Sequence, residues 1–197
     1  MEIGVLALQG DFIEHQSVLE KLGVKVRQIR LAEHLVGLAG LIIPGGESTT
    51  IGKLAVAYHL MEPLRDFGQK HAIWGTCAGA IFLSRDINRN QPLLGLMDIT
   101  VARNAFGRQV DSFEADLDIP VLAKVDPSNK PYHAVFIRAP LIESISGSAY
   151  AISKLPDGRI VAAQQGHLLA TSFHPELTDD DRFHRYFVEM AKSTYDH

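Results

Sequence analysis

A short glycine-flanked turn around the chain's single cysteine limits the possible folds more than any other stretch. Residues 75–79 read Gly-Thr-Cys-Ala-Gly, with an apolar run (72–74) before them and a helix-compatible run (78–83) after them. The pattern Gly-x-Cys-x-Gly has the form of the nucleophile turn Gly-x-Ser-x-Gly, in which a strand passes sharply into a helix. The flanking residues must be small because neighbouring backbone passes close to them. The turn therefore predicts a strand–turn–helix unit.

Cys77 has two interpretations from this turn alone. As a nucleophile it lies at the carboxyl end of a strand, where the free N–H groups of the following helix stabilise a thiolate. The N–H of Ala78 is then well placed to bind an oxyanion. As a structural residue Cys77 is simply buried, since free cysteine is among the most buried residue types.

Composition limits the class of protein. The chain has 197 residues with 46% hydrophobic and 21% charged content, which suits one α/β domain over residues 1–197. The net charge of −4 and the lack of a basic block argue against nucleic acid as a partner. A single cysteine excludes an internal disulfide, and with no signal-peptide pattern we expect a cytoplasmic protein. No apolar run approaches the length that spans a membrane, so we expect no membrane association.

The first half of the chain alternates strand and helix patterns. We expect strands at 3–8, 24–29, 41–43 and 72–74, helices at 11–22, 51–58 and 61–70, and a short helix or turn at 32–38. This alternation predicts a doubly wound parallel sheet, in which sites form beyond the carboxyl ends of the strands.

The second half is richer in strands. We expect strands at 94–105, 132–139, 149–155, 159–164 and 168–173, and a last helix at 182–193. The turn sequence Pro-Asp-Gly at 156–158 predicts a hairpin between two of these strands. The fold class that follows is α/β, with a mostly parallel central sheet and an added antiparallel hairpin region.

Two glycines, Gly45 and Gly46, follow the third expected strand and precede Glu47 and Ser48. A phosphate-binding loop is disfavoured because no Gly-Lys-Ser/Thr follows. An oxyanion-binding loop is favoured if the segment lies beside Cys77, and a plain tight turn is the alternative.

His174 and Glu176 close a strand pattern and precede the final helix. A cysteine nucleophile needs a base that takes its proton and returns it to the leaving group, which is the role expected of His174. Glu176 would hold the imidazole in the required tautomer. We expect most of the remaining histidines to be surface residues or, for His167, a satisfied polar group. These are His15, His34, His59, His71, His133, His167, His184 and His197. A zinc site is disfavoured because the chain has one cysteine and no His-Glu-x-x-His.

Two arginines, Arg103 and Arg138, follow strand patterns. An arginine at a strand end grips a carboxylate through two parallel hydrogen bonds. The alternative for both is a surface ion pair.

Together these motifs resemble those of the class I (triad) glutamine amidotransferases, and among them the glutaminase subunits of pyridoxal 5′-phosphate synthase. The matching stretches are 8–10, 44–50, 75–79, 103–114, 136–140 and 172–178. They span nearly the whole chain, although residues 120–131 contain no recognisable motif. The resemblance implies a flavodoxin-like three-layer fold.

The resemblance also implies roles for individual residues. Cys77 attacks the side-chain amide of L-glutamine, His174 protonates the departing ammonia and Glu176 orients His174. The N–H groups of Gly46 and Ala78 form the oxyanion hole. L-Glutamine is recognised by Gly46, Glu47, Ser48, Arg103, Ile137 and Arg138. Gln9 lies at the ammonia exit, and the reaction uses no metal or other cofactor.

The implied partner is a synthase subunit with a (β/α)8 barrel, in a complex of twelve synthase and twelve glutaminase subunits. The glutaminase of such a complex is nearly silent alone. Three alternatives stay open at this point: an amidotransferase subunit that serves another acceptor, a cysteine peptidase or chaperone on a similar sheet, and a non-enzymatic binding module.

Overall fold

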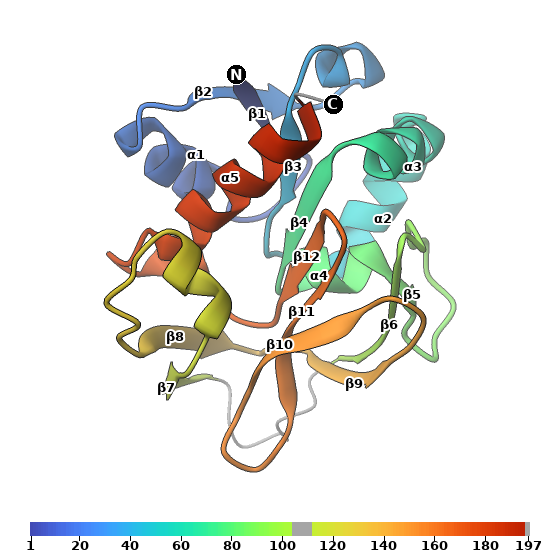
Figure 1. The fold of residues 1–197 in the computed structure, drawn as a ribbon. Coiled ribbons are helices and arrows are strands. Elements are labelled where there is room, and N and C mark those ends of the chain that lie inside the picture. Colours follow the sequence, from blue (N-terminus) through green and yellow to red (C-terminus); the bar gives the residue numbers. More distant parts are fainter. Residues whose placement is uncertain (104–111, 196–197) are drawn as a thin grey trace.

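A ten-stranded sheet forms the centre of the computed structural model, which describes residues 1–103 and 112–195 (Figure 1). Its parallel half consists of β2 (Lys25–Ile29), β1 (Glu2–Leu6), β3 (Gly40–Ile43), β4 (Ala72–Thr76) and β12 (Leu168–Thr171), in that spatial order. Strands β3, β4 and β12 are short, fully buried and mostly apolar runs, as expected of strands covered on both faces, whereas the edge strand β2 carries Lys25, Arg27 and Gln28.

The sheet continues beyond β12 with strands from the second half of the chain. They are β11 (Ile160–Gln165), β9 (Leu141–Ile145), β6 (Met97–Ala102) and β5 (Ser84–Asp86), and β10 (Tyr150–Lys154) pairs with β11. Pairing here is antiparallel except between β5 and β6. A separate antiparallel ribbon joins β7 (Ser112–Leu117) to β8 (Tyr132–Ile137).

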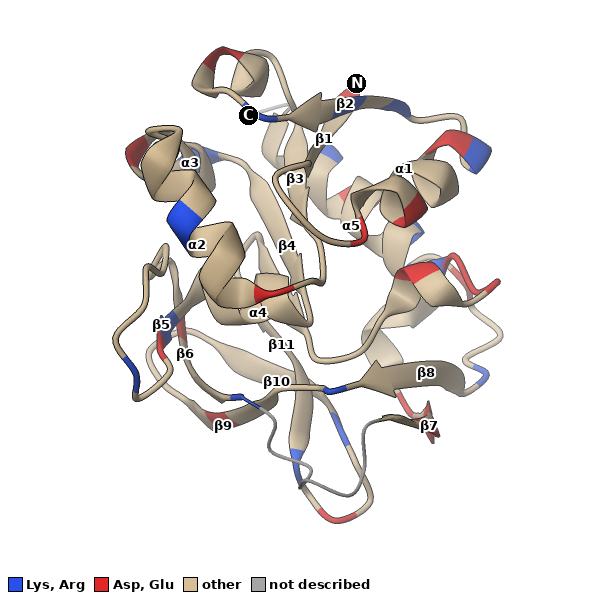
Figure 2. Ribbon diagram, turned by 180° about the vertical axis from the view of Figure 1, so that it is seen from behind, with Lys and Arg blue, Asp and Glu red and all other residues tan. Residues whose placement is uncertain are grey.

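Helices cover both faces of the parallel half, which gives three layers (Figures 1 and 2). One face carries α1 (Phe12–Lys21) and α5 (Arg182–Tyr195), and the other carries α2 (Ser48–Ala57), α3 (Met61–Lys70) and α4 (Ala78–Leu83). The described residues also form three short 3-10 helices: η1 (Ala32–Leu35), η2 (Pro120–Lys124) and η3 (Pro175–Leu177). Each face has its own apolar core; Trp74 packs with Phe183 and Phe187 on the α1/α5 side, and Ile73 packs with Phe82 on the other.

The structure confirms three predictions from the sequence: the α/β class, the parallel sheet of the first half, and the hairpin of β10 and β11. Helix α2 begins at Ser48, three residues earlier than predicted. The Glu47 side chain accepts hydrogen bonds from the N–H groups of Thr49 and Thr50, and this cap starts the helix inside the glycine loop. Strands β5, β7 and β9 were not predicted.

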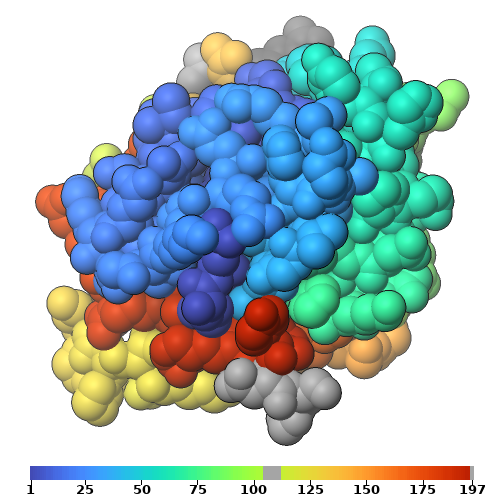
Figure 3. Space-filling view, turned by 90° about the horizontal axis from the view of Figure 1, so that it is seen from above, coloured from blue at the N-terminus to red at the C-terminus, as the bar shows by residue number. Residues whose placement is uncertain are grey.

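The N-terminus and the end of α5 lie side by side, as the space-filling view from above shows (Figure 3). Acidic and basic residues are scattered over the elements of the described chain (Figure 2). Within residues 1–103 and 112–195, no helix is long and apolar enough to cross a bilayer.

Candidate functional site

Cys77 occupies a strained turn between β4 and α4. Its backbone has φ 49° and ψ −107°, a conformation that side-chain-bearing residues rarely adopt. Its N–H donates to the carbonyl oxygen of Thr171 at 2.8 Å, which ties the turn to β12. A Cβ on Gly79 would lie 1.9 Å from the carbonyl oxygen of Ile43, so only glycine fits there. The predicted strand–turn–helix unit with small flanking residues is confirmed.

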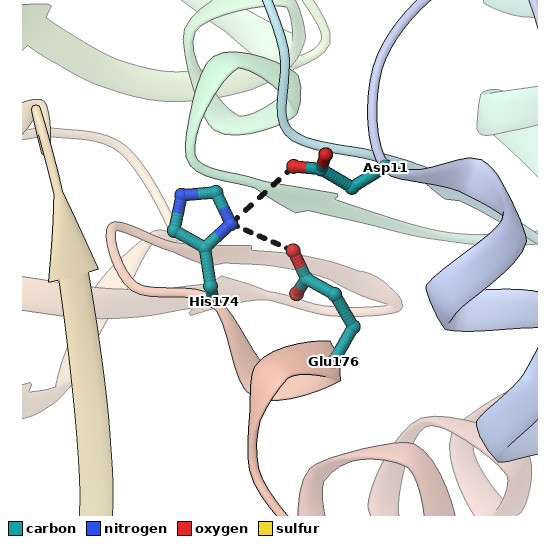
Figure 4. A group of neighbouring side chains, drawn as sticks. All are labelled: Asp11, His174 and Glu176. Atoms are coloured by element: carbon teal, nitrogen blue, oxygen red, sulfur yellow. Dashed lines mark hydrogen bonds and ion pairs between the residues drawn. The ribbon is translucent and has the colours of Figure 1, made fainter.

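His174 and Glu176 stand at the end of the neighbouring strand, β12. The N–H of His174 donates to the carbonyl oxygen of Val135, and its ring Nδ1 lies 2.6 Å from Oε1 of Glu176. Figure 4 shows this nitrogen facing two carboxylates, those of Glu176 and Asp11, while Nε2 points to the opposite side. Cys77 and His174 line the same cavity. Residues from two strand ends therefore meet, as the sequence predicts.

The electrostatics of the site favour an imidazolium. Burial opposes a charge on His174, but its interactions with Cys77 and Glu176 outweigh burial and raise the pKa of His174 to about 10. Among the described residues, Nε2 of His174 has no hydrogen bond of regular geometry, and the thiol of Cys77 lies 3.9 Å from the carbonyl oxygen of Ile137. Catalytic hydrogen bonds between such groups often tighten only when substrate is bound.

Glu176 is buried, with no exposed side-chain surface. Burial raises its pKa, and the proximity of His174 partly reverses this rise. An ionised Glu176 therefore depends on the positive charge that it faces. The pair has the geometry of an imidazole held in one tautomer by a buried carboxylate.

A cavity of about 340 Å³ opens beside the thiol. Its lining includes most of the site residues that the sequence singles out, together with Asp11 and Ile81, which it does not. The lining residues are Asp11, Gly46, Glu47, Ser48, Cys77, Ala78, Ile81, Arg103, Ile137, Arg138 and His174. A larger cavity of about 530 Å³ lies between Met1, Lys124 and Arg185, and neither Cys77 nor His174 lines it.

Arg103 is anchored at the mouth of the cavity. Its guanidinium lies 3.0 Å from Glu47 and donates at 3.1 Å to Thr49 Oγ1 and at 3.2 Å to Gln91 Oε1. Burial is the largest single influence on Glu47 and opposes its ionisation, but the hydrogen bonds from Thr50 and Thr49 together lower its pKa to about 2. The ion pair that sequence reasoning held as the alternative for Arg103 is present, and the same side chain also lines the cavity. Arg138 lines it as well, from a backbone with φ 45°.

Gln9 lies next to the cavity and supports its glycine loop. Its Oε1 accepts a hydrogen bond from the N–H of Glu47 at 2.7 Å. Gly46 has φ 151°, and a Cβ there would lie 2.5 Å from Gln9 Oε1. The loop therefore needs glycine at position 46, where the backbone comes close to both Gln9 and the cavity.

Sequence reasoning missed several residues around the site. Asp11 Oδ2 lies 3.6 Å from Nδ1 of His174, and burial raises the pKa of Asp11 despite the opposing effect of His174. Together with His174 and Glu176, Asp11 offers three ligand atoms within 4.8 Å of one another. A metal ion there would have to break the 2.6 Å bond between His174 and Glu176. The available signal was position, because Asp11 directly follows the Gln9-Gly10 strand end.

Two of the other histidines, His15 and His184, are exceptions to the expectation that most of them lie at the surface. Both are 0% exposed, and they contact each other at 2.9 Å. Burial lowers the pKa of His184 to about 3. The pKa of His15 lies well below its usual range, mainly because of burial and to a lesser degree because of the neighbouring His184. His167 is a satisfied polar group, as predicted, because its Nε2 lies 2.8 Å from the carbonyl oxygen of Gly68. The greater part of the 103–114 motif, residues 104–111, lies outside the described residues.

Comparisons with known proteins consistently find relatives of one kind. The model of the SNO glutamine amidotransferase family matches residues 5–193. Two proteins named pyridoxal 5′-phosphate synthase subunit PdxT, from Herpetosiphon aurantiacus and Moorella thermoacetica, are 57% and 58% identical to the chain. Each alignment covers 96% of this chain, and they cover 100% and 99% of the relatives. A solved structure described as a glutamine amidotransferase is 48% identical, with a TM-score of 0.89, over 96% of this chain and 98% of that one.

Proposed function

The chain belongs to the SNO glutamine amidotransferase family, and from this premise we propose that it hydrolyses L-glutamine to L-glutamate and ammonia with Cys77, His174 and Glu176. The ammonia serves pyridoxal 5′-phosphate synthesis, as the names of its relatives imply. The observation that carries the proposal is the meeting of a strained cysteine turn with a buried His174–Glu176 pair at one cavity. The match of the family model to residues 5–193 supports one glutaminase domain over residues 1–197.

In the first half-reaction the Cys77 thiolate attacks the amide carbon of glutamine, and the carbonyl oxygen becomes an oxyanion. The N–H groups of Gly46 and Ala78 stabilise it. The C–N bond then breaks, the imidazolium of His174 gives its proton to the departing ammonia, and a glutamyl thioester remains. In the second half-reaction His174 takes a proton from water, the hydroxide attacks the thioester, and glutamate leaves with the thiolate restored.

Glutamine is held by the polar lining of the cavity. Arg103 and Arg138 supply positive charge for the substrate carboxylate, and Glu47 supplies a carboxylate that stays ionised throughout the neutral range. Ser48 and the backbone of Ile137 complete the set of recognition groups. The cavity volume of about 340 Å³ is at the small end of ligand sites, which suits an amino acid.

The partner is the synthase subunit, a (β/α)8 barrel that consumes the ammonia. We place the ammonia exit at Gln9, because this side chain lies behind the glycine loop that borders the thiol. The proposed assembly has twelve subunits of each kind and works in the cytoplasm, with neither nucleic acid nor membrane involved. Ammonia is neutral and small, so direct transfer between subunits prevents its loss to solvent.

The test is release of glutamate from glutamine, with and without the synthase subunit, for the native chain and Cys77→Ala. We expect activity in the native complex, loss of it in Cys77→Ala, and unchanged association of that variant with the synthase. Glutamine labelled with ¹⁵N in the amide should label pyridoxal 5′-phosphate, which separates this acceptor from others. An active Cys77→Ala complex would contradict the proposal.

A further inference from the structure

Behind the triad lies a buried row of polar side chains that the reaction above does not use. His15 on α1 contacts His184 on α5 through Nδ1 at 2.9 Å. Its other ring nitrogen, Nε2, lies 3.1 Å from Thr76 Oγ1 and 3.3 Å from Oε2 of Glu176. His15, Thr76 and His184 are each 0% exposed. Three elements far apart in sequence therefore bring buried polar side chains to the back of Glu176.

This row of side chains faces Oε2 of Glu176, the outer oxygen of the carboxylate. Oε1 faces His174, but Oε2 has no hydrogen bond of regular geometry from the described residues. His15 Nε2, at 3.3 Å, is the polar atom that faces it. A buried carboxylate oxygen without a donor is strongly disfavoured, so a small tilt of the His15 ring toward Oε2 relieves a real deficit.

The contact with the Glu176 carboxylate selects the tautomer of His15, because either tautomer would satisfy the contacts with His184 and Thr76. Burial keeps this ring neutral, so it has one N–H and one lone pair. With the proton on Nε2, the ring donates toward Thr76 and Glu176, and Nδ1 accepts from Nε2–H of His184. The opposite tautomer would direct a lone pair at the carboxylate. Nδ1 of His184 then carries no proton, in agreement with its lack of a partner among the described residues.

We propose that His15 is a positioning residue for the triad: its Nε2–H holds the outer oxygen of Glu176, so that the carboxylate stays ionised and aimed at His174, while His184 donates to Nδ1 of His15. The proposal rests on the function proposed above for Cys77, His174 and Glu176. His15 does not line the cavity, so it acts through Glu176 and not on the substrate.

Loss of the His15 donor has a predictable sign. A hydrogen bond to the ionised form lowers the pKa of a carboxyl group, so its removal raises the pKa of Glu176. Activity requires ionised Glu176, and the acid limb of the pH profile therefore moves to higher pH. The other titratable groups that face Glu176 are His174, Asp11 and Tyr132. All three stay in place in a His15 variant, so a shifted limb reports the His15 contact.

The experiment compares His15→Gln with His15→Asn in the complex with the synthase subunit. The amide nitrogen of glutamine reaches the place of Nε2, whereas that of asparagine reaches only the place of Nδ1. We expect His15→Gln to keep most of the activity. We expect His15→Asn to lower kcat by about 10- to 100-fold and to move the acid limb up by about one pH unit, with KM within about twofold. Leu19→Ala, on the same helix and 0% exposed, is the stability control and should leave the limb in place.

A second readout needs neither partner nor glutamine. Cys77 is the only cysteine, so its alkylation by iodoacetamide across pH reports thiolate formation in the isolated chain. In His15→Asn the alkylation profile should move to higher pH, and in His15→Gln it should stay near the native one. A native complex that releases no glutamate would overturn the proposed function but not this result. The role of His15 would be overturned if His15→Gln and His15→Asn gave the same pH profile, whether both were shifted or both unshifted. A shift of equal size in Leu19→Ala would also overturn it.

Discussion

At the scale of single residues, the site depends on one buried carboxylate. Glu176 has no exposed side-chain surface and binds Nδ1 of His174 at 2.6 Å. Asp11 approaches the same nitrogen at 3.6 Å from a side chain that is 40% exposed. Because solvent screens the Asp11 charge, the two carboxylates have unequal influence on the imidazole.

The substitution Glu176→Gln tests this inequality. The amide keeps the shape of the side chain but offers His174 the wrong hydrogen-bonding partner, so the imidazole adopts the wrong tautomer. We expect kcat for glutamate release to fall by about 10²- to 10⁴-fold, with a small change in KM. The matched control is Asp11→Asn, for which we expect less than about a tenfold loss. Equal losses in the two variants would contradict the assigned roles.

Sequence predicted Cys77, His174 and Glu176 because each stands in a short local pattern at the end of a strand. His15 and Asp11 have no such pattern, since their importance comes from contacts with residues about 160 positions away. Asp11 is the N-cap residue of α1 and His15 follows four residues later, so both lie on the same side of the start of the helix. This signal can be used only when that side is known to face the site.

At the scale of elements, the turn between β4 and α4 positions the nucleophile. The positive φ of Cys77 and the close approach of Gly79 to Ile43 show that the strand, the turn and the helix are locked together. The turn is strained, and the surrounding contacts hold it in place.

The substitution Gly79→Ala should disturb this turn. A Cβ 1.9 Å from the carbonyl oxygen of Ile43 forces α4 away from β3, so we expect a stability loss of about 1–3 kcal/mol and a large fall in kcat. Gly23→Ala is the control, because its Cβ meets nothing within 4 Å and only its φ of 73° is unfavourable. It should lose about 1 kcal/mol in urea denaturation and keep its activity. An active, stable Gly79→Ala protein would contradict this account of the turn.

Elements in the first half were predictable because apolar strands and amphipathic helices alternate there. Three strands of the second half were not. β5 has three residues, and β7 alternates exposed acidic positions with half-buried ones, so neither has an apolar run. β9 contains Glu143 and Ser144 in five residues, and its place in the sheet depends on its partners β6 and β11.

At the scale of the whole molecule, two buried histidines link stability to pH. The folded protein keeps His15 and His184 neutral, whereas the unfolded chain protonates both near pH 6.5. The unfolded state thus binds more protons below that pH, and stability falls as pH falls. His174 has a raised pKa of about 10, so its contribution is fully present below pH 6.5 and is lost only as pH rises toward 10. The raised pKa of Glu176 opposes the acid loss in part.

We therefore expect the free energy of unfolding to fall between pH 6.5 and pH 5, by about 1 kcal/mol per pH unit for each of the two histidines. Urea denaturation at several pH values measures this slope. His184→Gln keeps a donor for His15 but cannot titrate. Its free energy of unfolding should therefore fall less steeply with pH than that of the native protein, by about 1 kcal/mol per pH unit. Parallel curves would show that burial of His184 does not govern acid stability.

The most direct test of the central claim is covalent labelling of the thiol by a glutamine analogue. The complex with the synthase subunit is treated with diazo-oxo-norleucine and analysed by intact mass and peptide mapping. Because the chain has one cysteine, the account predicts a single adduct on Cys77, slowed by excess glutamine and strongly reduced in His174→Asn. An unlabelled Cys77 in a complex that still releases glutamate, or labelling that glutamine does not slow, would contradict it.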